Sequence, residues 1–318
     1  MRSYCATICC GALLMVLFLI LGADAESYVP YTPPPYYDPG PYSDVAQGDV
    51  DLFNFVLNLE YLEAELFLWS AYGYGLDQIA PQLTGGGPPP AGLEKAQLDE
   101  FTRDIVAQLG NQEVGHLSAI RATVTDAAIS RPYLNLSVGV WTKIFDSAFG
   151  MNLNPPFNPY VNSLNFLLAI YAVPYVGLTG YVGANPNLVG YTSKRLLAGL
   201  LGVEAGQDAI IRSLLYEKKD ERVHPYPYSV ADFTNKLSEL RNRLDNEGSI
   251  DDLGLTAPQT ATPPVHGSIL SADKRWVSFS RTPEQILSIV YSTGDPSKPG
   301  GFYPYGGNGE IARYYLQD

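Results

Sequence analysis

Glu113 and His116 are the two residues of this sequence whose types and spacing are best suited to chemistry. Residues three positions apart in a helix share one face, so their side chains point the same way. Helical spacing places both on an otherwise apolar stripe that should face the protein interior, namely Val106, Leu109, Glu113, His116, Ile120 and Val124. A buried carboxylate is costly unless it is paired or binds a metal. The motif therefore predicts either metal ligands or a buried Glu–His pair that only fixes the helix register.

Two further stretches each place an acid on an otherwise apolar helical face. Glu60 lies on the stripe formed by Phe53, Val56, Glu60, Ala64 and Phe67. Glu204 lies on the stripe formed by Leu197, Leu200, Glu204, Gln207, Ile211 and Leu214. Facing helices that supply Glu and Glu-x-x-His side chains form carboxylate-bridged metal sites in four-helix bundles. Three helices with inward acids therefore favour a metal site over an isolated pair.

Long helices must position these residues. Apolar periodicity and turn residues predict helices over 49–72, 93–128, 159–183 and 190–219 for a bundle, with shorter helices over 139–148, 230–246 and 282–291. Asp49 is the expected N-cap of the first helix, Pro174 should kink the third, and Thr282 with Gln285 should form a capping box. The sequence has no alternating pattern long enough for a sheet. The predicted fold class is all-α: a four-helix bundle with an additional packed helix and a turn-rich C-terminal region.

The N-terminal part of the chain is expected to lie outside the bundle. An apolar segment over residues 8–21 is followed by Ala23 and Ala25 in a small-x-small pattern, which predicts a secretory signal peptide over 1–25. The apolar segment is shorter than the roughly 20 residues that a membrane-spanning helix needs. All three cysteines lie within the signal peptide, so the mature chain would have no disulfide. Residues 26–46 are rich in proline and tyrosine, which predicts an extended tether.

Composition and charge narrow the functional classes. Hydrophobic residues make up 46% of the chain and charged residues 17%, which is typical of a packed protein rather than a disordered protectant. The formal net charge of −13 argues against nucleic-acid binding. After signal cleavage we expect no membrane association. The expected domains are the bundle over 47–221 and, over 222–318, a helix with a turn-rich extension packed on it.

Asn135, His224 and His266 lie outside the predicted ligand stripes. The sequon Asn135-Leu136-Ser137 lies in a turn-rich connection and predicts glycosylation at Asn135. His224 and His266 lie in predicted loops beside prolines, where we expect structural roles.

The chain resembles the desiccation-related proteins of the ferritin-like superfamily, the group associated with resurrection plants. The resemblance covers nearly all of residues 48–318 and is carried by these segments: LNLEYLEAELFLW around residues 58–69, TRDIVAQLGNQEVGHL over 102–117, LAIYAVPYVGLTGYVGANP over 168–186, KRLLAGLLGVEAGQDAIIRSLLYEKKDE over 194–221 and GGFYPYGGNGEIAR over 300–313. It implies a ferritin-like four-helix bundle.

The resemblance also implies a ligand set, formed by Glu60, Glu113, His116 and Glu204. Two positions depart from the family pattern of a carboxylate from each of two helices and Glu-x-x-His from the other two. Gln207 stands where a second histidine is expected, and Pro174 stands where metal-binding relatives carry glutamate. The predicted centre is therefore degenerate and would hold at most one ion of iron, manganese or zinc. The alternative is a vestigial site that binds no metal.

These observations lead to three functional hypotheses. The preferred one is a secreted, extracellular stress protein of the desiccation-related group, located in the apoplast or cell wall, that acts as a non-catalytic protective scaffold or sequesters a metal. The second is an active di-iron-type metalloenzyme, either an iron oxidase or a peroxide-consuming enzyme. The third is a structural or interaction module that binds cell-wall components through the Pro/Tyr-rich tether.

Overall fold

The computed structural model describes residues 45–246, 252–257, 263–273 and 275–316, which belong to a compact unit spanning Tyr42–Asp318. Within these ranges the regular elements are helices, accompanied by isolated β-bridges but by no strand. The all-α prediction is confirmed. The predicted signal peptide and nearly all of the predicted tether lie outside the described residues.

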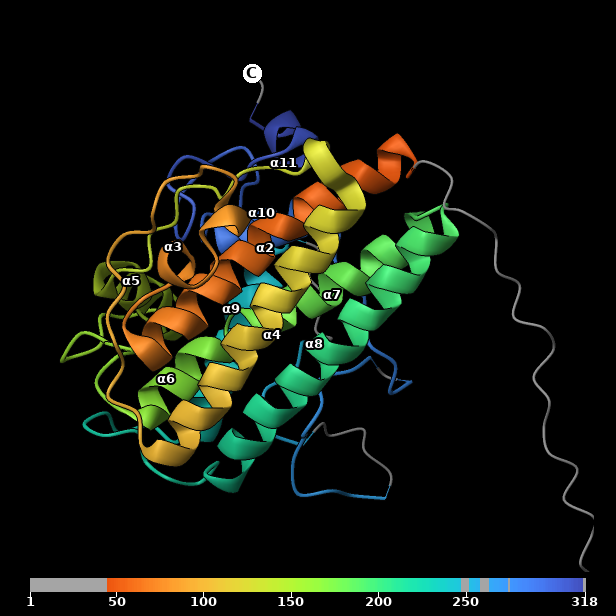
Figure 1. Cartoon of the computed structure of the whole chain (residues 1–318). Coiled ribbons are helices and arrows are strands. Elements are labelled where there is room, and N and C mark those ends of the chain that lie inside the picture. Colours follow the sequence, from red (N-terminus) through yellow and green to blue (C-terminus); the bar gives the residue numbers. More distant parts are fainter. Residues whose placement is uncertain (1–44, 247–251, 258–262, 274, 317–318) are drawn as a thin grey trace, which may run out of the picture. The chain divides into compact units, whose positions relative to one another are not determined.

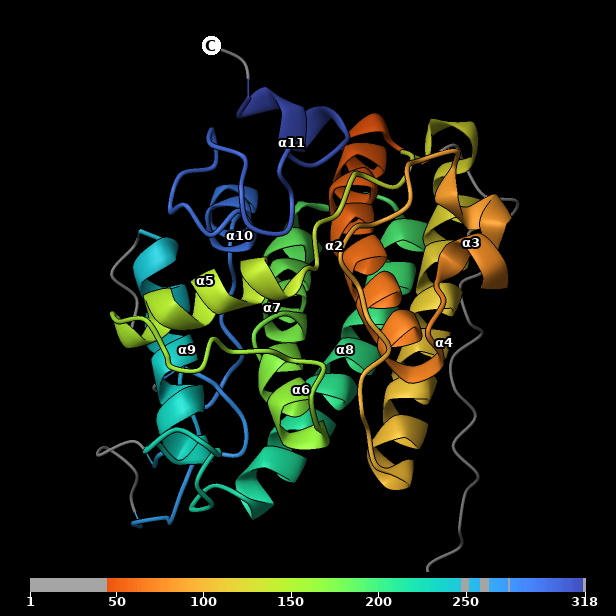
Figure 2. The same ribbon diagram turned by 90° about the vertical axis from the view of Figure 1, so that its left-hand side faces the viewer.

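Four helical stretches form the bundle (Figure 1). They are α2 (Gln47–Tyr72), α4 (Glu100–Val124), α8 (Tyr191–Glu217) and the consecutive pair α6 (Ser163–Ile170) and α7 (Pro174–Ala184). α2 packs along α4, and α7 packs along α8, as both views show (Figures 1 and 2). α2 is buried around most of its circumference, as expected from its nearly continuous apolar sequence.

The beginning of α2 differs from the sequence prediction. Asp49 is not the N-cap, because the helix begins two residues earlier, at Gln47. Its carboxylate instead accepts hydrogen bonds from the backbone N–H groups of Val189 and Gly190, at 3.0 and 2.9 Å. Asp49 therefore ties the beginning of α2 to the turn that precedes α8.

The beginning of α4 also differs, because the helix starts at Glu100 and not at residue 93. Asp99 has extended backbone, and its Oδ1 accepts a hydrogen bond from the backbone N–H of Thr102 at 2.9 Å. This N-cap satisfies a donor that the first helical turn leaves free. The hydroxyl of Ser163 also donates to Asp99, which links the cap of α4 to the beginning of α6.

The predicted third helix is broken rather than kinked. Pro174 lacks a backbone N–H, and it occupies the first turn of α7, where that donor would be unpaired in any case. α6 ends at Ile170, so three residues separate the two helices. The proline thus begins a helix here.

The remaining helices lie around the bundle. The predicted short helices are present as α5 (Val138–Phe149), α9 (Val230–Leu244) and α10 (Pro283–Val290). Thr282 and Gln285 form the predicted capping box of α10. Short elements that we did not predict are α3 (Leu76–Ile79), η1 (Pro81–Thr84), η2 (Thr125–Ala127), η3 (Asn185–Asn187) and α11 (Glu310–Tyr314). In Figure 2, α5, α9 and α10 lie on the α7 side of the bundle.

A buried arginine fixes the C-terminal region to the bundle. Arg212 of α8 donates to the hydroxyl of Tyr171 and to four backbone carbonyls, those of Leu253, Gly254, Ser268 and Ile269. Nearby, Arg241 of α9 pairs with the buried carboxylate of Asp252 at 2.6 Å. Buried polar groups are tolerated where they are hydrogen-bonded in this way, so the described residues 252–254 and 268–269 are held by side chains of α8 and α9.

One described stretch, Ser163–Asn187, is long and apolar enough by composition to cross a membrane. It comprises α6, α7 and η3, and 78% of its most apolar window is buried inside the protein. Its apolar character is thus accounted for by its position in the core of the bundle.

Candidate metal centre

The four sequence-predicted ligands converge in the interior of the bundle. Glu60 comes from α2, Glu113 and His116 from α4, and Glu204 from α8, and all four are buried. One ligand atom from each lies within 4.8 Å of those of the other three. His116 Nδ1 is 3.1 Å from Glu60 Oε2 and 3.3 Å from both Glu113 Oε2 and Glu204 Oε1. The predicted apolar stripes therefore identified the correct helix faces.

Two further side chains orient these carboxylates. The hydroxyl of Tyr181, on α7, donates to Oε1 of Glu60. The side-chain amide of Gln207 donates through Nε2 to Glu113 Oε1 and, at 3.2 Å, to Gln112 Oε1. Gln207 thus lies at the site as predicted, and it holds Glu113 in place. The Tyr181 contact was not predicted, because only the tertiary packing of α7 on α2 brings the two residues together.

Glu63 is a fourth acid at the site that sequence reasoning missed. It follows Glu60 by one turn of α2 and is 2% exposed, and its pKa is raised by burial and by the charges of Glu204, Glu113 and Glu60. Glu60-x-x-Glu63 is a recognisable spacing. The acid was overlooked because α2 is apolar around most of its circumference and offers no contrast between an inner and an outer face.

Burial and mutual contacts set the charges of the metal-free site. Burial raises the pKa of Glu204 to about 7, against the hydrogen bond of His116. Burial and the charge of Glu204 raise the pKa values of Glu63 and Glu113 well above their usual range. Burial disfavours protonation of His116, but its hydrogen bonds to the carboxylates outweigh this and raise its pKa. Burial also opposes ionisation of Glu60, yet the hydrogen bond and charge of His116 lower its pKa. A metal ion would displace these protons.

The donor atoms fit a divalent metal ion. Glu204 Oε2, Glu63 Oε2 and Gln207 Oε1 are buried and have no hydrogen-bond partner among the described residues, and Glu113 Oε2 and Glu204 Oε1 face only the imidazole of His116, at 3.3 Å. Unpaired buried oxygens of this kind require an explanation, and a bound cation is one. Bond lengths of about 2.0–2.2 Å put donors on opposite sides of a metal roughly 4.2 Å apart, which is close to the observed spread. An oxygen-rich set with one imidazole suits iron, manganese or zinc.

A surface cleft leads to His116. It has a volume of about 410 Å³ and is lined by His116 and by residues of α8 between Tyr191 and Val203. His116 is 7% exposed, so the imidazole lies at the inner end of a solvent path. Arg195 also lines the cleft and is exposed.

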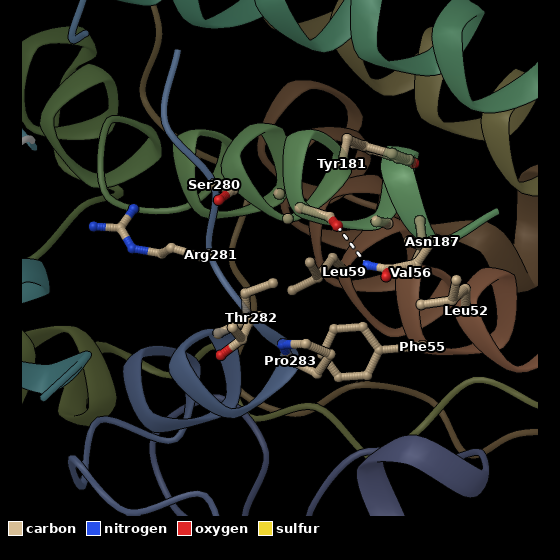
Figure 3. A pocket seen from close by; sticks show the side chains of 15 residues that line it. Leu52, Phe55, Val56, Leu59, Tyr181, Asn187, Ser280, Arg281, Thr282 and Pro283 are labelled. Carbon is tan, nitrogen blue, oxygen red and sulfur yellow. Dashed lines mark hydrogen bonds between the residues drawn. The ribbon is translucent and has the colours of Figure 1, made fainter. Parts of the chain in front are cut away.

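A second, mostly apolar cavity lies behind Tyr181 (Figure 3). Its volume is about 130 Å³, and it lies between α2, α7 and the segment that leads into α10. Val56 and Leu59 extend into it from α2, and Pro283 closes it at the beginning of α10 (Figure 3). The ring of Tyr181 therefore lines this cavity, while its hydroxyl contacts Glu60.

The other predicted positions lie elsewhere or adopt different roles. The α7 residues beside the carboxylates are Gly177 and Tyr181, about one and two turns after Pro174. His224 and His266 are exposed and do not belong to the ligand group. Asn135 is half-buried before α5, and its Oδ1 accepts a hydrogen bond from the backbone N–H of Ser137 at 3.2 Å. Its glycosylation stays a prediction.

Comparison with known proteins agrees with this geometry. A family model described as a ferritin-like domain matches residues 48–217, the part of the chain that contains the whole ligand group together with Tyr181 and Gln207. The chain belongs to the ferritin-like family.

Two curated relatives match most of this ferritin-like chain. It is 54% identical over 274 residues to the ferritin-like catalase Nec2 of Nesocodon mauritianus, covering 86% of this chain and 87% of the relative. It is 51% identical over 263 residues to the desiccation-related protein PCC13-62 of Craterostigma plantagineum, covering 82% and 83%. The resemblance to desiccation-related plant proteins of this superfamily is thus confirmed. No solved structure matches the chain significantly.

Proposed function

We propose that this protein is a peroxide-consuming metalloprotein of the desiccation-related group, which converts two hydrogen peroxide molecules into two water molecules and one dioxygen. The observation that carries the proposal is the buried convergence of Glu60, Glu113, His116 and Glu204, whose carboxylates share a single imidazole and in which Glu204 Oε2 has no partner among the described residues. The relative named a catalase supports this reaction class. The preference for a non-catalytic scaffold, drawn from the sequence, becomes the second candidate.

The protein's own residues would hold iron or manganese and arrange the surroundings of the metal. When bound, such an ion supplies two-electron redox chemistry with peroxide, which zinc cannot do because it does not change oxidation state. Tyr181 holds Glu60 through a hydrogen bond to one oxygen and leaves the other facing His116. Burial and the charge of Glu60 raise the pKa of Tyr181 well above 10, so its hydroxyl remains a donor at neutral pH. Gln207 holds Glu113 in the same manner.

The surface cleft at His116 suits a polar substrate, and the cavity behind Tyr181 suits an apolar product. Hydrogen peroxide is polar and would enter through the solvent cleft at His116. Dioxygen is apolar, and the cavity behind Tyr181 is mostly apolar and of a size that holds small apolar molecules. We propose the cleft as the entry path and the cavity as a transient dioxygen site.

Oxygen evolution tests the proposal. Protein loaded with manganese or iron and freed of excess metal should release one dioxygen for every two peroxides consumed, measured with an oxygen electrode. His116→Ala should lose the activity, because it is the only imidazole in the ligand group. The loaded protein should exceed the same concentration of free metal ion by orders of magnitude. Metal-loaded protein no faster than free metal would refute the catalytic proposal.

A metal-sequestering scaffold is the second candidate. Gln207 at a position where the family pattern expects histidine favours it, and so does the lack of an acid in α7. Tight binding of metal without oxygen evolution would support this candidate. The predicted signal peptide supports a location outside the cell for either activity, and we propose that the tether contacts wall components there. Release of the mature chain into the medium or wall fraction would test that location.

A further inference from the structure

The surface cleft that ends at His116 is larger and more apolar than hydrogen peroxide requires. Its volume is about 410 Å³, within the range of roughly 300–1,000 Å³ that is usual for clefts that bind small organic molecules. Its walls include Leu196, Leu200 and Val203 of α8. Peroxide is a small polar molecule, so the proposed reaction does not explain the apolar walls or most of the space.

Arg195 places a cation in this cleft. It is exposed, lines the cleft, and belongs to none of the ion pairs formed by the described residues. The full chain contains 33 acidic and 20 basic residues, so charge balance alone would favour an acidic partner for each arginine. Hydrogen peroxide is uncharged and does not explain this cation. A carboxylate would, because the forked N–H donors of a guanidinium match its two oxygens.

The order of residues along α8 determines how such a ligand would lie. Arg195 precedes Val203 by eight residues and Glu204 by nine, which corresponds to about 12–13 Å along the helix. A carboxylate held at Arg195 therefore stays away from the buried acid of Glu204. The apolar walls between Arg195 and Val203 would cover the body of the ligand, and its far end would approach His116.

Gly199 keeps the middle of the cleft open. An added Cβ at this position would meet no neighbouring atom within 4 Å, so packing within the chain does not require a glycine here. Glycine weakens a helix interior, and close approach of a ligand to the backbone is one reason for it to occur there. A larger side chain at Gly199 would project into the cleft and fill it.

We propose that this cleft binds a small organic monocarboxylate with an apolar body, with the carboxylate at Arg195 and the body directed towards His116. A bound molecule would cover the path to His116 and slow the entry of peroxide. This regulatory effect rests on the proposed function. The binding itself does not, because the cleft and Arg195 belong to the metal-free protein.

Calorimetric titration of metal-free protein with 3-phenylpropionate tests the binding. We expect one molecule per chain. Propionate lacks the apolar body and 3-phenylpropanol lacks the charge, so each should bind at least about tenfold more weakly. Arg195→Gln should weaken binding of 3-phenylpropionate about tenfold and leave that of the alcohol unchanged. Gly199→Leu should abolish binding of both.

Lys194→Gln and Gly202→Leu are the matched controls. They make the same changes at exposed positions of α8 that do not line the cleft, and an added Cβ at Gly202 also meets no neighbouring atom within 4 Å. Both variants should bind 3-phenylpropionate as wild type does. Melting curves establish that each variant is folded.

Three results would overturn the binding site. They are a wild type that does not bind 3-phenylpropionate at millimolar concentration, a Lys194→Gln variant weakened as much as Arg195→Gln, and a dimer in sedimentation velocity that Gly199→Leu dissociates. The dimer would show that a second copy occupies the cleft.

Oxygen evolution by the metal-loaded protein tests the regulatory effect. Saturating 3-phenylpropionate should raise the peroxide concentration needed for half-maximal oxygen evolution. An unchanged rate at every peroxide concentration would overturn this effect. Protein that binds 3-phenylpropionate but evolves no oxygen would support the binding site and refute only the proposed catalysis.

Discussion

Replacing Glu113 by glutamine should have opposite effects on stability in the absence and presence of metal. Glutamine keeps the size of the side chain, and its oxygen can still accept the hydrogen bond from Gln207. In chelator the change removes a buried acid that burial and Glu204 make costly to ionise. Replacing buried ionic groups by neutral ones of similar volume stabilises proteins by about 1–4 kcal/mol. We expect the lower end, about 1 kcal/mol, because the raised pKa lets Glu113 stay protonated.

With metal present the order should reverse. A ligand at 100 times its dissociation constant stabilises the folded wild type by about 2.7 kcal/mol, and a variant that lacks an essential ligand gains none of this. Glu113→Gln would then be about 1.7 kcal/mol less stable than wild type. For a unit of this length, 1 kcal/mol corresponds to roughly 2 °C in melting temperature. The variant should melt about 2 °C above wild type in chelator and about 3 °C below it in manganese.

Scanning calorimetry in chelator and in manganese measures both differences. Glu100→Gln is the matched control, because it makes the same substitution at an exposed position of α4. It should show the full wild-type response to metal. A Glu113→Gln variant that gains as much from metal as wild type would show that Glu113 is not a ligand. A Glu113→Gln variant that is less stable than wild type in chelator would show that the Glu113 carboxyl does not destabilise the metal-free protein.

Four other outcomes follow from the structure or the sequence. Gln207→His should tighten metal binding at least tenfold in calorimetric titration, because an imidazole binds these metals better than an amide does. Burial raises the pKa of Asp208 to about 6. The contribution of its protonated carboxyl to the stability of the folded state is therefore complete below pH 3.8 and lost as the pH rises through 6. In urea unfolding with chelator, Asp208→Asn should be about 2–3 kcal/mol more stable than wild type at pH 7.5 and equal to it at pH 3.8. Arg131→Met should cost about 3–5 kcal/mol by leaving Glu65 unpaired, and adding Glu65→Leu should recover much of it. N-terminal sequencing of secreted protein should show cleavage after Ala25.

The helix faces that carry the site could be predicted from the sequence because each one has a polar residue among apolar neighbours. The stripes of α4 and α8 each contain an acid among aliphatic residues, and Glu113, His116 and Glu204 are buried as their spacing predicts. Glu60 could be chosen on α2 because it falls in register with Phe53 and Phe67. Hydrophobic periodicity reports which side of a helix faces inward, and here that information was sufficient.

The rest depended on tertiary packing that periodicity does not encode. Glu63 lies on a helix that is buried on nearly all sides, so no pattern distinguishes its direction. Pro174 could not show which α7 residues lie beside the carboxylates. The break between α6 and α7 changes the helical register from that of one continuous helix. Tyr181 and Gly177 emerged as the α7 neighbours only from the packing of that helix. The beginning of α4 was set by Asp99, a cap that the preceding apolar residues concealed.

The distribution of donors over the helices bears on how the centre can be both rigid and accessible. Glu60 and Glu63 lie on α2, and Glu113 and His116 lie on α4, two helices that contact each other along their length. Donors on packed regular helices need little reordering when metal binds, which favours affinity. α8 contacts α4 less closely, and the cleft that reaches His116 opens along it. Solvent can therefore approach along α8 while Glu60, Glu113 and His116 remain fixed by the α2–α4 contact.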